Sequence, residues 1–190
     1  MATEAAEKKG VVNGVDVDQL FATVEAVKGT SEIAKFRFRL KNRWINGGHN
    51  HITVKDFYGA QEEQIHETPF ELDADEHQIL LGEDKGPNPV EYLLTGLSGC
   101  LTSALVYHSA AKGIDVKGIE SRVEGDLDLR GFLGLDPNVK VGYEQIRVYM
   151  KIDADVSDEQ KEELVKMAQK YSPVFNTVAN ATPVKVSLDQ

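Results

Sequence analysis

The chain has 190 residues, the usual size of one domain or of two small ones. Its 31 acidic and 21 basic residues give a formal net charge of −10 at pH 7, which argues against a nucleic-acid partner and against binding to an anionic membrane surface. We find no apolar run that approaches the about 20 residues of a membrane-spanning helix. Hydrophobic residues make up 41% and charged residues 27%, as in a soluble globular protein.

The N-terminal part predicts a loose leader followed by a short helix. The polar start, residues 1–9, lacks the apolar segment of a secretory signal, and a single cysteine fits a reducing compartment, so we expect a cytoplasmic protein. Residues 1–15 are expected to be a leader, and residues 16–28 place apolar side chains at helical spacing up to Gly29. We therefore separate residues 1–30 from a main domain over residues 31–190.

The next stretch predicts strands. From Ile33 to Leu40 apolar residues alternate with lysine and arginine, which indicates a half-buried strand. Asn46-Gly47-Gly48 is a hairpin turn signal, and His49–Phe57 is expected to be the return strand. Pro69–Leu72 and Ile79–Leu81 are expected to be short strands or ordered loops.

The strongest element is a long helix that begins near Asn88. Asn88 can cap it, Pro89 suits its first position, and Glu91 at the third position completes a capping-box-like start. A broad apolar stripe then continues to about Lys112, and Gly113 ends it, which indicates a central buried helix.

The C-terminal part predicts a long hairpin, two helices and a last strand. The hairpin has alternating arms and an exposed apolar tip at residues 131–137, a candidate contact surface. The remaining elements follow in this order: strands over residues 116–129 and 141–152, a helix capped by Ser157 with Gln160 and running to about Lys170, a helix over residues 174–180 after Ser172-Pro173, and a strand over residues 184–188. The fold class is α+β with a mainly antiparallel sheet.

Cys100 is the only cysteine, so it forms no disulfide within its own chain. Chemistry at this residue needs the thiolate, because the thiol is a poor nucleophile. The middle of a helix gives no help from the helix dipole, so a cation must stabilise the anion. Small neighbours such as Gly96 and Gly99 would let another segment approach the sulfur. The alternative is a small buried hydrophobic residue, which free cysteine often is.

These segments together resemble the osmotically inducible protein C (OsmC) and organic hydroperoxide resistance family. The similarity covers roughly residues 34–188 and includes Gly86-Pro87-Asn88-Pro89, Gly99-Cys100-Leu101 and the late Ser172–Asn176. It implies two chains interlocked as a homodimer, with strands of both wrapped around long central helices and active sites at the interface. It also implies a reactive cysteine that attacks an organic hydroperoxide, an arginine and a glutamate that hold it as thiolate, and a second cysteine that resolves the sulfenic acid.

Carried onto this chain, the resemblance implies Cys100 as the peroxidatic thiol, Arg43 as its cationic partner and Glu91 as the glutamate. Two positions depart from the family's pattern. Val90 stands where the glutamate usually follows Asn-Pro, and Glu91 comes one residue later, about 100° further around the helix. Ser172 stands where the second cysteine usually lies. We therefore expect a one-cysteine member that depends on an external thiol reductant.

Other kinds of site receive little support from the sequence. His49 and His51 alternate on a strand and share a face, a spacing that can ligate a metal, but no further ligand is evident nearby. No glycine-rich phosphate loop or serine hydrolase motif is present. We expect no metal and no cofactor.

Three functions remain open from the sequence. The first is a thiol-dependent reduction of organic hydroperoxides through Cys100, with a role in oxidative stress. The second is a dimeric scaffold, or a binder of a small apolar ligand, in which Cys100 is inert. The third is a sulfur carrier or redox sensor that forms mixed disulfides.

Overall fold

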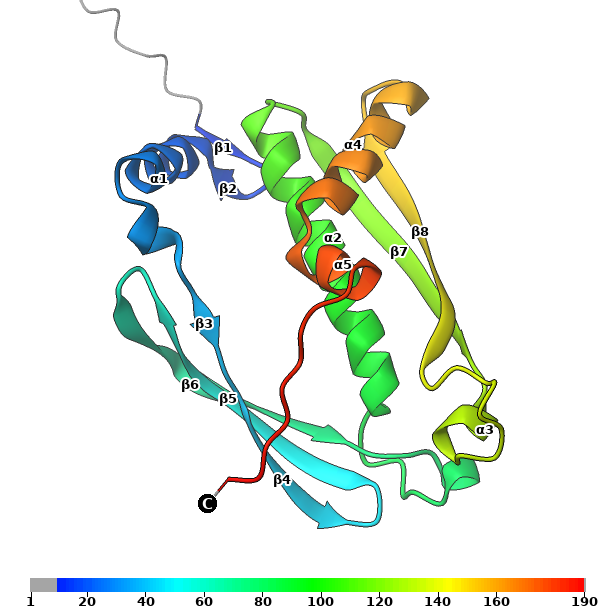
Figure 1. The fold of residues 1–190 in the computed structure, drawn as a ribbon. Helices are drawn as coiled ribbons and strands as arrows, with labels where there is room; N and C mark the ends of the chain where they lie inside the picture. The colour runs from blue at the N-terminus through cyan, green and yellow to red at the C-terminus, as the bar shows by residue number, and fades with distance from the viewer. Residues whose placement is uncertain (1–9, 190) are drawn as a thin grey trace, which may run out of the picture. The chain divides into compact units, whose positions relative to one another are not determined.

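The structure, a computed structural model, describes residues 10–189 (Figure 1). The first nine residues of the predicted leader lie outside the described residues. Contacts divide the described chain into two compact units, one formed by Asp18–Leu93 and the other by the residues up to Val17 together with those from Leu94 onward. The boundary predicted at residue 30 stays a prediction.

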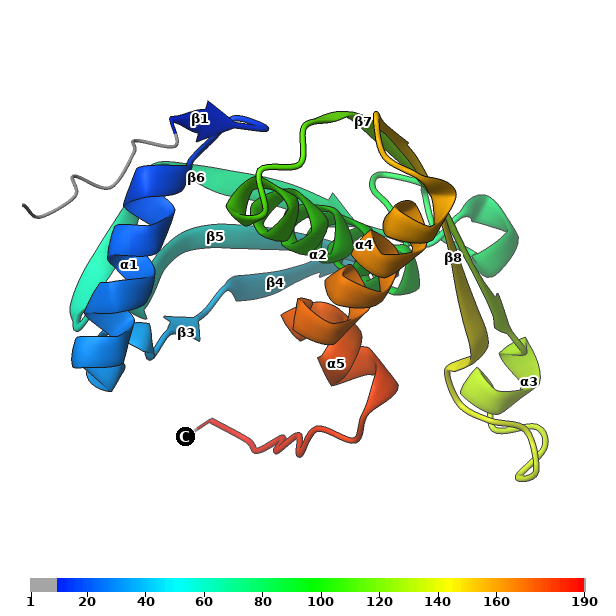
Figure 2. The ribbon, with the colours of Figure 1, turned by 90° about the horizontal axis from the view of Figure 1, so that it is seen from above.

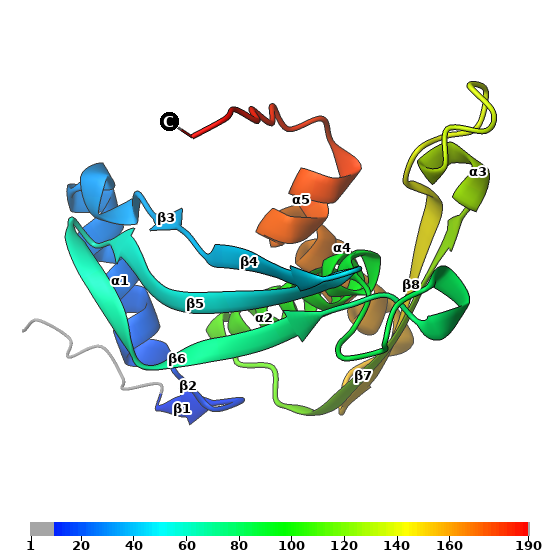
Figure 3. The same ribbon diagram turned by 90° about the horizontal axis from the view of Figure 1, so that it is seen from below.

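The Asp18–Leu93 unit contains an antiparallel sheet centred on one long strand, β5. One edge of β5 pairs with β3 and β4, and the other edge pairs with β6, so that β4, β5 and β6 lie side by side (Figure 3). The elements of this part of the chain are α1 (Val17–Gly29), the 3-10 helix η1 (Ser31–Ala34), β3 (Arg37–Phe38), β4 (Lys41–Asn46), β5 (His49–Gly59), β6 (Glu62–Ala74) and the 3-10 helix η2 (Gln78–Leu80).

Several predictions for this unit are confirmed and one is wrong. The helix before Gly29, the turn after Asn46 and the return strand are present. The expected strand from Ile33 to Leu40 is reduced to β3, and β4 begins only at Lys41. Residues 39 and 40 lie between the pairs Phe38–Phe57 and Lys41–Thr53, opposite three residues of β5, so the pairing is interrupted there. Phe36 and Phe38, expected to be half-buried, are 52% and 75% exposed and stack on one another.

The other unit packs two helices against a long hairpin (Figures 1 and 2). Its core consists of an α2 stripe at four-residue spacing and residues of β8 and α4: Leu97, Leu101, Leu105, Ile152, Ala154, Leu164 and Ala168. Its elements are β1 (Val11–Val12), β2 (Val15–Asp16), most of α2 (Pro89–Ala111), β7 (Val116–Leu127), α3 (Leu129–Phe132), β8 (Tyr143–Ala154), α4 (Asp158–Tyr171) and α5 (Pro173–Ala179).

The helix and hairpin predictions for this unit are confirmed, with three corrections. Residues 11–16 form the small hairpin β1–β2 instead of a loose leader. The exposed apolar tip is present, but its first part is the helix α3. The strand expected over residues 184–188 is not formed: no strand pairing involves it in the described part of the chain, and Val184, Val186 and Leu188 are 82%, 91% and 89% exposed. Alternation marks a potential strand, but a strand also needs a partner edge.

The long helix α2 is less buried than its composition predicts. Among its apolar residues Leu97, Leu101 and Leu105 are buried, but Leu93 and Tyr107 are 42% and 52% exposed. By length and composition alone α2 would be able to cross a membrane, so the expectation that no apolar run approaches that length is wrong. One such helix is weak evidence, because the core helix of a soluble protein passes the same test.

The β1–β2 hairpin is anchored to β7 by one side chain. Asn13 Nδ2 donates to the carbonyl of Ile114 at 2.9 Å, and Asn13 Oδ1 accepts from the Val116 N–H at 2.8 Å. The backbone φ of Asn13 is 54°, in the left-handed region, which asparagine tolerates better than most residues.

Asn13→Gly tests this anchor without straining the backbone, because glycine also adopts the left-handed conformation. We expect a loss of about 1 to 3 kcal/mol of unfolding free energy, since two backbone groups lose their partners. Urea unfolding measures the loss, and amide hydrogen exchange at Val116 should accelerate. Asn42→Ala, which removes one exposed side-chain bond, is the control and should change stability by less than about 0.5 kcal/mol. Unchanged protection of Val116 would show that the anchor is unimportant.

Candidate functional site

Cys100 lies on α2 at the edge of its buried stripe. Its neighbour Leu101 is 3% exposed, whereas Cys100 itself is half-buried, so its sulfur is not sealed in the core of this chain. A side chain on a helix leans toward the helix N-terminus, which places the sulfur over Gly96, one turn earlier. A Cβ added at Gly96 or Gly99 would meet no atom of residues 10–189 within 4 Å. The two glycines therefore leave open space beside the thiol.

Glu91 completes the start of α2. The Asn88 N–H donates to Glu91 Oε2 at 2.9 Å, and the Val90 N–H donates to Asn88 Oδ1 at 3.0 Å. The Glu91 bond is one half of the capping box that the sequence predicts, whereas the Asn88 side chain caps the second helical residue instead of the third. The carboxylate thus has a structural role at the helix start, and a further role beside Arg43 stays a prediction.

Ser172, at the place of the family's usual second cysteine, is a buried helix cap. It is 0% exposed, its Oγ accepts from the Phe175 N–H at 3.1 Å, and its own N–H donates to the Ala168 carbonyl. The residue joins the end of α4 to the start of α5, which accounts for a serine there.

Arg43 lies in β4, in the other unit from Cys100. It is the third residue of β4, beyond the strand that the sequence predicts up to Leu40. Within residues 10–189 no hydrogen bond or ion pair involves its guanidinium. Its direct cross-strand partner on β5 is His51.

A cluster of histidines and carboxylates lies next to Arg43, and the sequence did not reveal it. His49 Nε2 and His51 Nδ1 lie 2.9 and 3.1 Å from the same oxygen, Asp73 Oδ1, and His51 Nε2 lies 3.0 Å from Glu71 Oε2. Hydrogen bonds from His49 and His51 lower the pKa of Asp73. Glu71 and Asp73 are two residues apart, as are His49 and His51. This matching spacing is the sequence signal by which the cluster was open to prediction. Across residues 10–189, no three metal-ligating side chains are arranged to hold a metal ion.

Asp75 holds the loop that leads from this sheet to α2. Its carboxylate is 1% exposed and accepts from the backbone N–H groups of Glu76, Glu83 and Lys85 at 2.8, 3.0 and 3.2 Å. Burial alone would raise the pKa of Asp75, but the three hydrogen bonds outweigh it and the pKa lies below its ordinary value. The loop also passes close to the sheet, since a Cβ at Gly86 would lie 2.0 Å from the Asp73 carbonyl oxygen.

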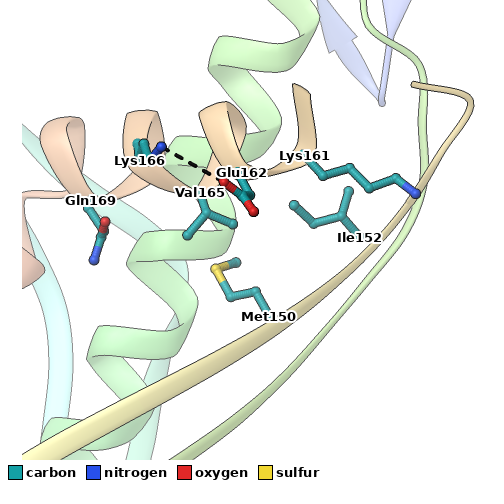
Figure 4. A pocket seen from close by; sticks show the side chains of 7 residues that line it. All are labelled: Met150, Ile152, Lys161, Glu162, Val165, Lys166 and Gln169. Carbon is teal, nitrogen blue, oxygen red and sulfur yellow. Dashed lines mark ion pairs between the residues drawn. The ribbon is translucent and has the colours of Figure 1, made fainter. Parts of the chain in front are cut away.

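A groove of about 400 Å³ lies between α4 and β8 (Figure 4). Met150, Ile152 and Val165 form its apolar part, and Lys161, Glu162, Lys166 and Gln169 complete its lining. Cys100 is not among these residues, so the groove is separate from the thiol.

The α+β fold with its long cysteine-bearing helix matches solved structures of OsmC-like proteins. One from Mycoplasma pneumoniae is 18% identical, with a TM-score of 0.57 over 76% of this chain and 89% of that chain. An organic hydroperoxide resistance protein OsmC from Legionella pneumophila is also 18% identical, with a TM-score of 0.51 over 74% of this chain and 88% of that chain. An OsmC-like protein of unknown function from Vibrio cholerae is 11% identical, with a TM-score of 0.57 over 74% of this chain and 92% of that chain. At these identities the likeness shows the fold.

The sequence itself also matches the family model described as OsmC-like protein, over residues 82–187. This match covers more than half of the 190 residues, and the chain belongs to the OsmC-like family. Among curated proteins, none matches this chain.

Asp75→Asn should destabilise the protein above about pH 4 and weaken the pH dependence of its stability. The native pKa of Asp75 is depressed, so the ionised carboxylate stabilises the fold above its unfolded pKa of about 3.9, and this stabilisation is lost as pH falls through the lower native pKa. Thermal unfolding between pH 2 and 7 measures the difference, which should be largest at pH 7 and shrink toward pH 2. Asp153→Asn, on an exposed strand position, is the control. Parallel curves for Asp75→Asn and the unsubstituted protein would contradict this role.

Glu91→Ala should lower the unfolding free energy by about 1 kcal/mol, because the Asn88 N–H loses its acceptor. Glu91→Gln should cost less than about 0.5 kcal/mol, since glutamine also serves at this position of a capping box. Urea unfolding measures both, with Glu163→Ala on α4 as the control for losing an exposed helical glutamate. Equal losses for Glu91→Ala and Glu91→Gln would mean that the charge matters and that capping does not.

Proposed function

We propose that this protein reduces organic hydroperoxides with Cys100 as the reacting thiol. The observation that carries the proposal is a lone, half-buried cysteine on the long helix of an OsmC-like chain, with open space beside it. The family match and a neighbour named as an organic hydroperoxide resistance protein support the substrate class.

The chemistry requires two external electrons and two external thiols. The Cys100 thiolate attacks the terminal oxygen of the hydroperoxide, the O–O bond breaks, and the alkoxide leaves as an alcohol after taking a proton. Cys100 is then a sulfenic acid. An external thiol displaces water to give a mixed disulfide, and a second thiol releases the Cys100 thiolate together with the oxidised reductant. Ser172 cannot replace the first of these thiols.

Arg43 is the proposed cation for the thiolate. Lowering the pKa of a thiol by two units takes about 2.7 kcal/mol of differential stabilisation, which a nearby guanidinium can supply. The absence of an acidic partner for Arg43 within residues 10–189 supports this role, since its charge is not neutralised by an ion pair. Glu91, at the start of the helix that carries Cys100, is proposed to orient Arg43 in addition to capping.

We further propose a homodimer that acts in the cytoplasm without a cofactor. The exposed apolar residues of α2 and the unpaired, alternating segment at residues 184–188 support a second copy as the partner, because both features remain open to solvent in one chain.

Cys100→Ser should abolish turnover of an organic hydroperoxide such as cumene hydroperoxide in the presence of a dithiol. Arg43→Ala should lower the rate of the first step about tenfold and shift the midpoint of Cys100 alkylation to higher pH, because the thiolate loses its cation. Stopped-flow kinetics and iodoacetamide labelling measure both effects, with the exposed Arg37→Ala as control.

Turnover that survives in Cys100→Ser would refute the proposal. A Cys100 that resists alkylation in the folded protein would favour the scaffold or ligand-binding function instead. Adducts with glutathione in mass spectra, without turnover, would favour the redox sensor.

A further inference from the structure

We propose that Asn46 is a site of spontaneous deamidation, at which a side-chain amide is converted into a carboxylate next to Arg43. The chain contains two Asn-Gly pairs, Asn13-Gly14 and Asn46-Gly47. The structure holds the first asparagine by two hydrogen bonds and leaves the second exposed. All the groups around the second pair belong to the Asp18–Leu93 unit. The inference requires neither the reacting thiol nor a hydroperoxide, so it stands apart from the proposed function.

The reaction consumes only water. The backbone nitrogen of Gly47 attacks the side-chain carbonyl carbon of Asn46 and gives up its proton, and the amide nitrogen leaves as ammonia, so that a five-membered succinimide ring forms. Water then opens the ring at one of its two carbonyls, which yields aspartate or isoaspartate, and nothing is oxidised or reduced. Glycine is the most favourable following residue, because it has no Cβ to hinder the attack.

Both reacting groups at Asn46 lack hydrogen bonds. Asn46 is exposed, and neither its side-chain amide nor the backbone N–H of Gly47 is hydrogen-bonded within residues 10–189. Trp44 Nε1 donates to the Gly47 carbonyl at 3.0 Å, but this contact involves neither reacting atom. Deamidation at this pair therefore breaks no side-chain hydrogen bond.

The backbone around Asn46 is at a weak point of the sheet. Among the described strands β4 pairs with β5 alone, and all six of its residues are exposed (Figure 3). The register shifts between Trp44 and Asn46, so the last pair of the ladder, Asn46 with His49, follows an irregularity. Segments with few buried contacts open most often. The attack requires backbone rotation at Asn46, which such an opening permits.

Asn13 has the same following residue but a restrained side chain. It is half-buried, its Nδ2 donates to the Ile114 carbonyl at 2.9 Å, and its Oδ1 accepts from the Val116 N–H at 2.8 Å. Rotation of this amide toward the Gly14 nitrogen breaks both bonds. The Gly14 N–H has no backbone acceptor within residues 10–189 either, so the side chains distinguish the two pairs.

The bulge in β4 brings the new carboxylate to the face of Arg43. Arg43 is directly opposite His51, and Asn46 is directly opposite His49. The two histidines are two residues apart on one strand and share a face, and directly paired residues project from the same face. Arg43 and Asn46 are therefore neighbours on one face of the sheet, although they are three residues apart in the chain.

A carboxylate at position 46 is a new partner for the guanidinium of Arg43. Arg43 has no ion pair within residues 10–189, and the carboxylates already present on this face, Asp73 and Glu71, contact His51. Aspartate at position 46 adds an acceptor beside Arg43. Isoaspartate also lengthens the backbone by one carbon, which disturbs the end of the β4–β5 ladder.

The first experiment incubates the full chain at pH 8 and follows the tryptic peptides 44–55 and 10–28 by mass spectrometry. Conversion of amide to acid should be about tenfold faster at Asn46 than at Asn13, because the anchored site opens less often. In urea, where the fold is lost, the two sites should convert at the same rate. Asn46→Gln, which does not readily form a five-membered ring, should remove the mass gain from peptide 44–55.

Three outcomes of this experiment would overturn the site. Equal rates at Asn13 and Asn46 in the folded protein would show that the anchor gives no protection. No conversion at Asn46 in the folded protein, while both sites convert in urea, would show that the turn does not open. A mass gain that persists in Asn46→Gln would assign the reaction to Asn50, which lies in the same peptide.

The second experiment tests where the carboxylate lies. The Arg43 Nε–H resonance should shift in Asn46→Asp and stay in place in Asn46→Gln, and the resonance of Arg37, on β3, should be unchanged in both. Amide hydrogen exchange over residues 44–50 should accelerate in the aged protein. An Arg43 resonance that is the same in Asn46→Asp and in the unsubstituted protein would overturn the pairing with Arg43.

Discussion

The burial of one stripe of α2 fixes the direction of every other side chain on that helix. Leu97, Leu101 and Leu105 are at most 3% exposed and pack with residues of β8 and α4, so α2 has one rotation about its axis. One residue step turns a side chain by about 100°, and Cys100 therefore lies at the border between the buried stripe and the open surface. A shift of the stripe by one position would either seal the sulfur or expose it fully.

The sequence predicted correctly those helix starts that depend on residues close together in the chain. Asn88, Pro89 and Glu91 predicted the start of α2, and Ser157 with Gln160 predicted the capping box of α4, because a cap involves residues only three apart. The expected strand over residues 33–40 is short because its first residues belong to η1 and its last two lie where pairing with β5 is interrupted, and the alternation of Phe36 and Phe38 does not contain that information.

The histidine cluster was not found from the sequence for the same physical reason. His49 and Asp73 are 24 residues apart, and they meet only because β5 and β6 pair in one register out of several possible ones. A slip by one residue would turn one set of side chains to the opposite face. The sequence showed two histidines on one face, but it did not show which residues of the next strand face them.

Arg43 differs from most arginines of the described chain in its lack of a partner. Arg39 bonds Asp56 and Glu63, and Arg147 bonds Glu124 and Asp126, as expected in a chain with a net charge of −10. Acidic residues are also present next to Arg43, but histidines hold them.

An unpaired guanidinium in so acidic a chain needs an explanation, and the histidines supply it by competing for the same carboxylates. His51 lies between Arg43 and Asp73 in one row of the sheet, and it contacts the carboxylate oxygen of Asp73 that the guanidinium would otherwise reach.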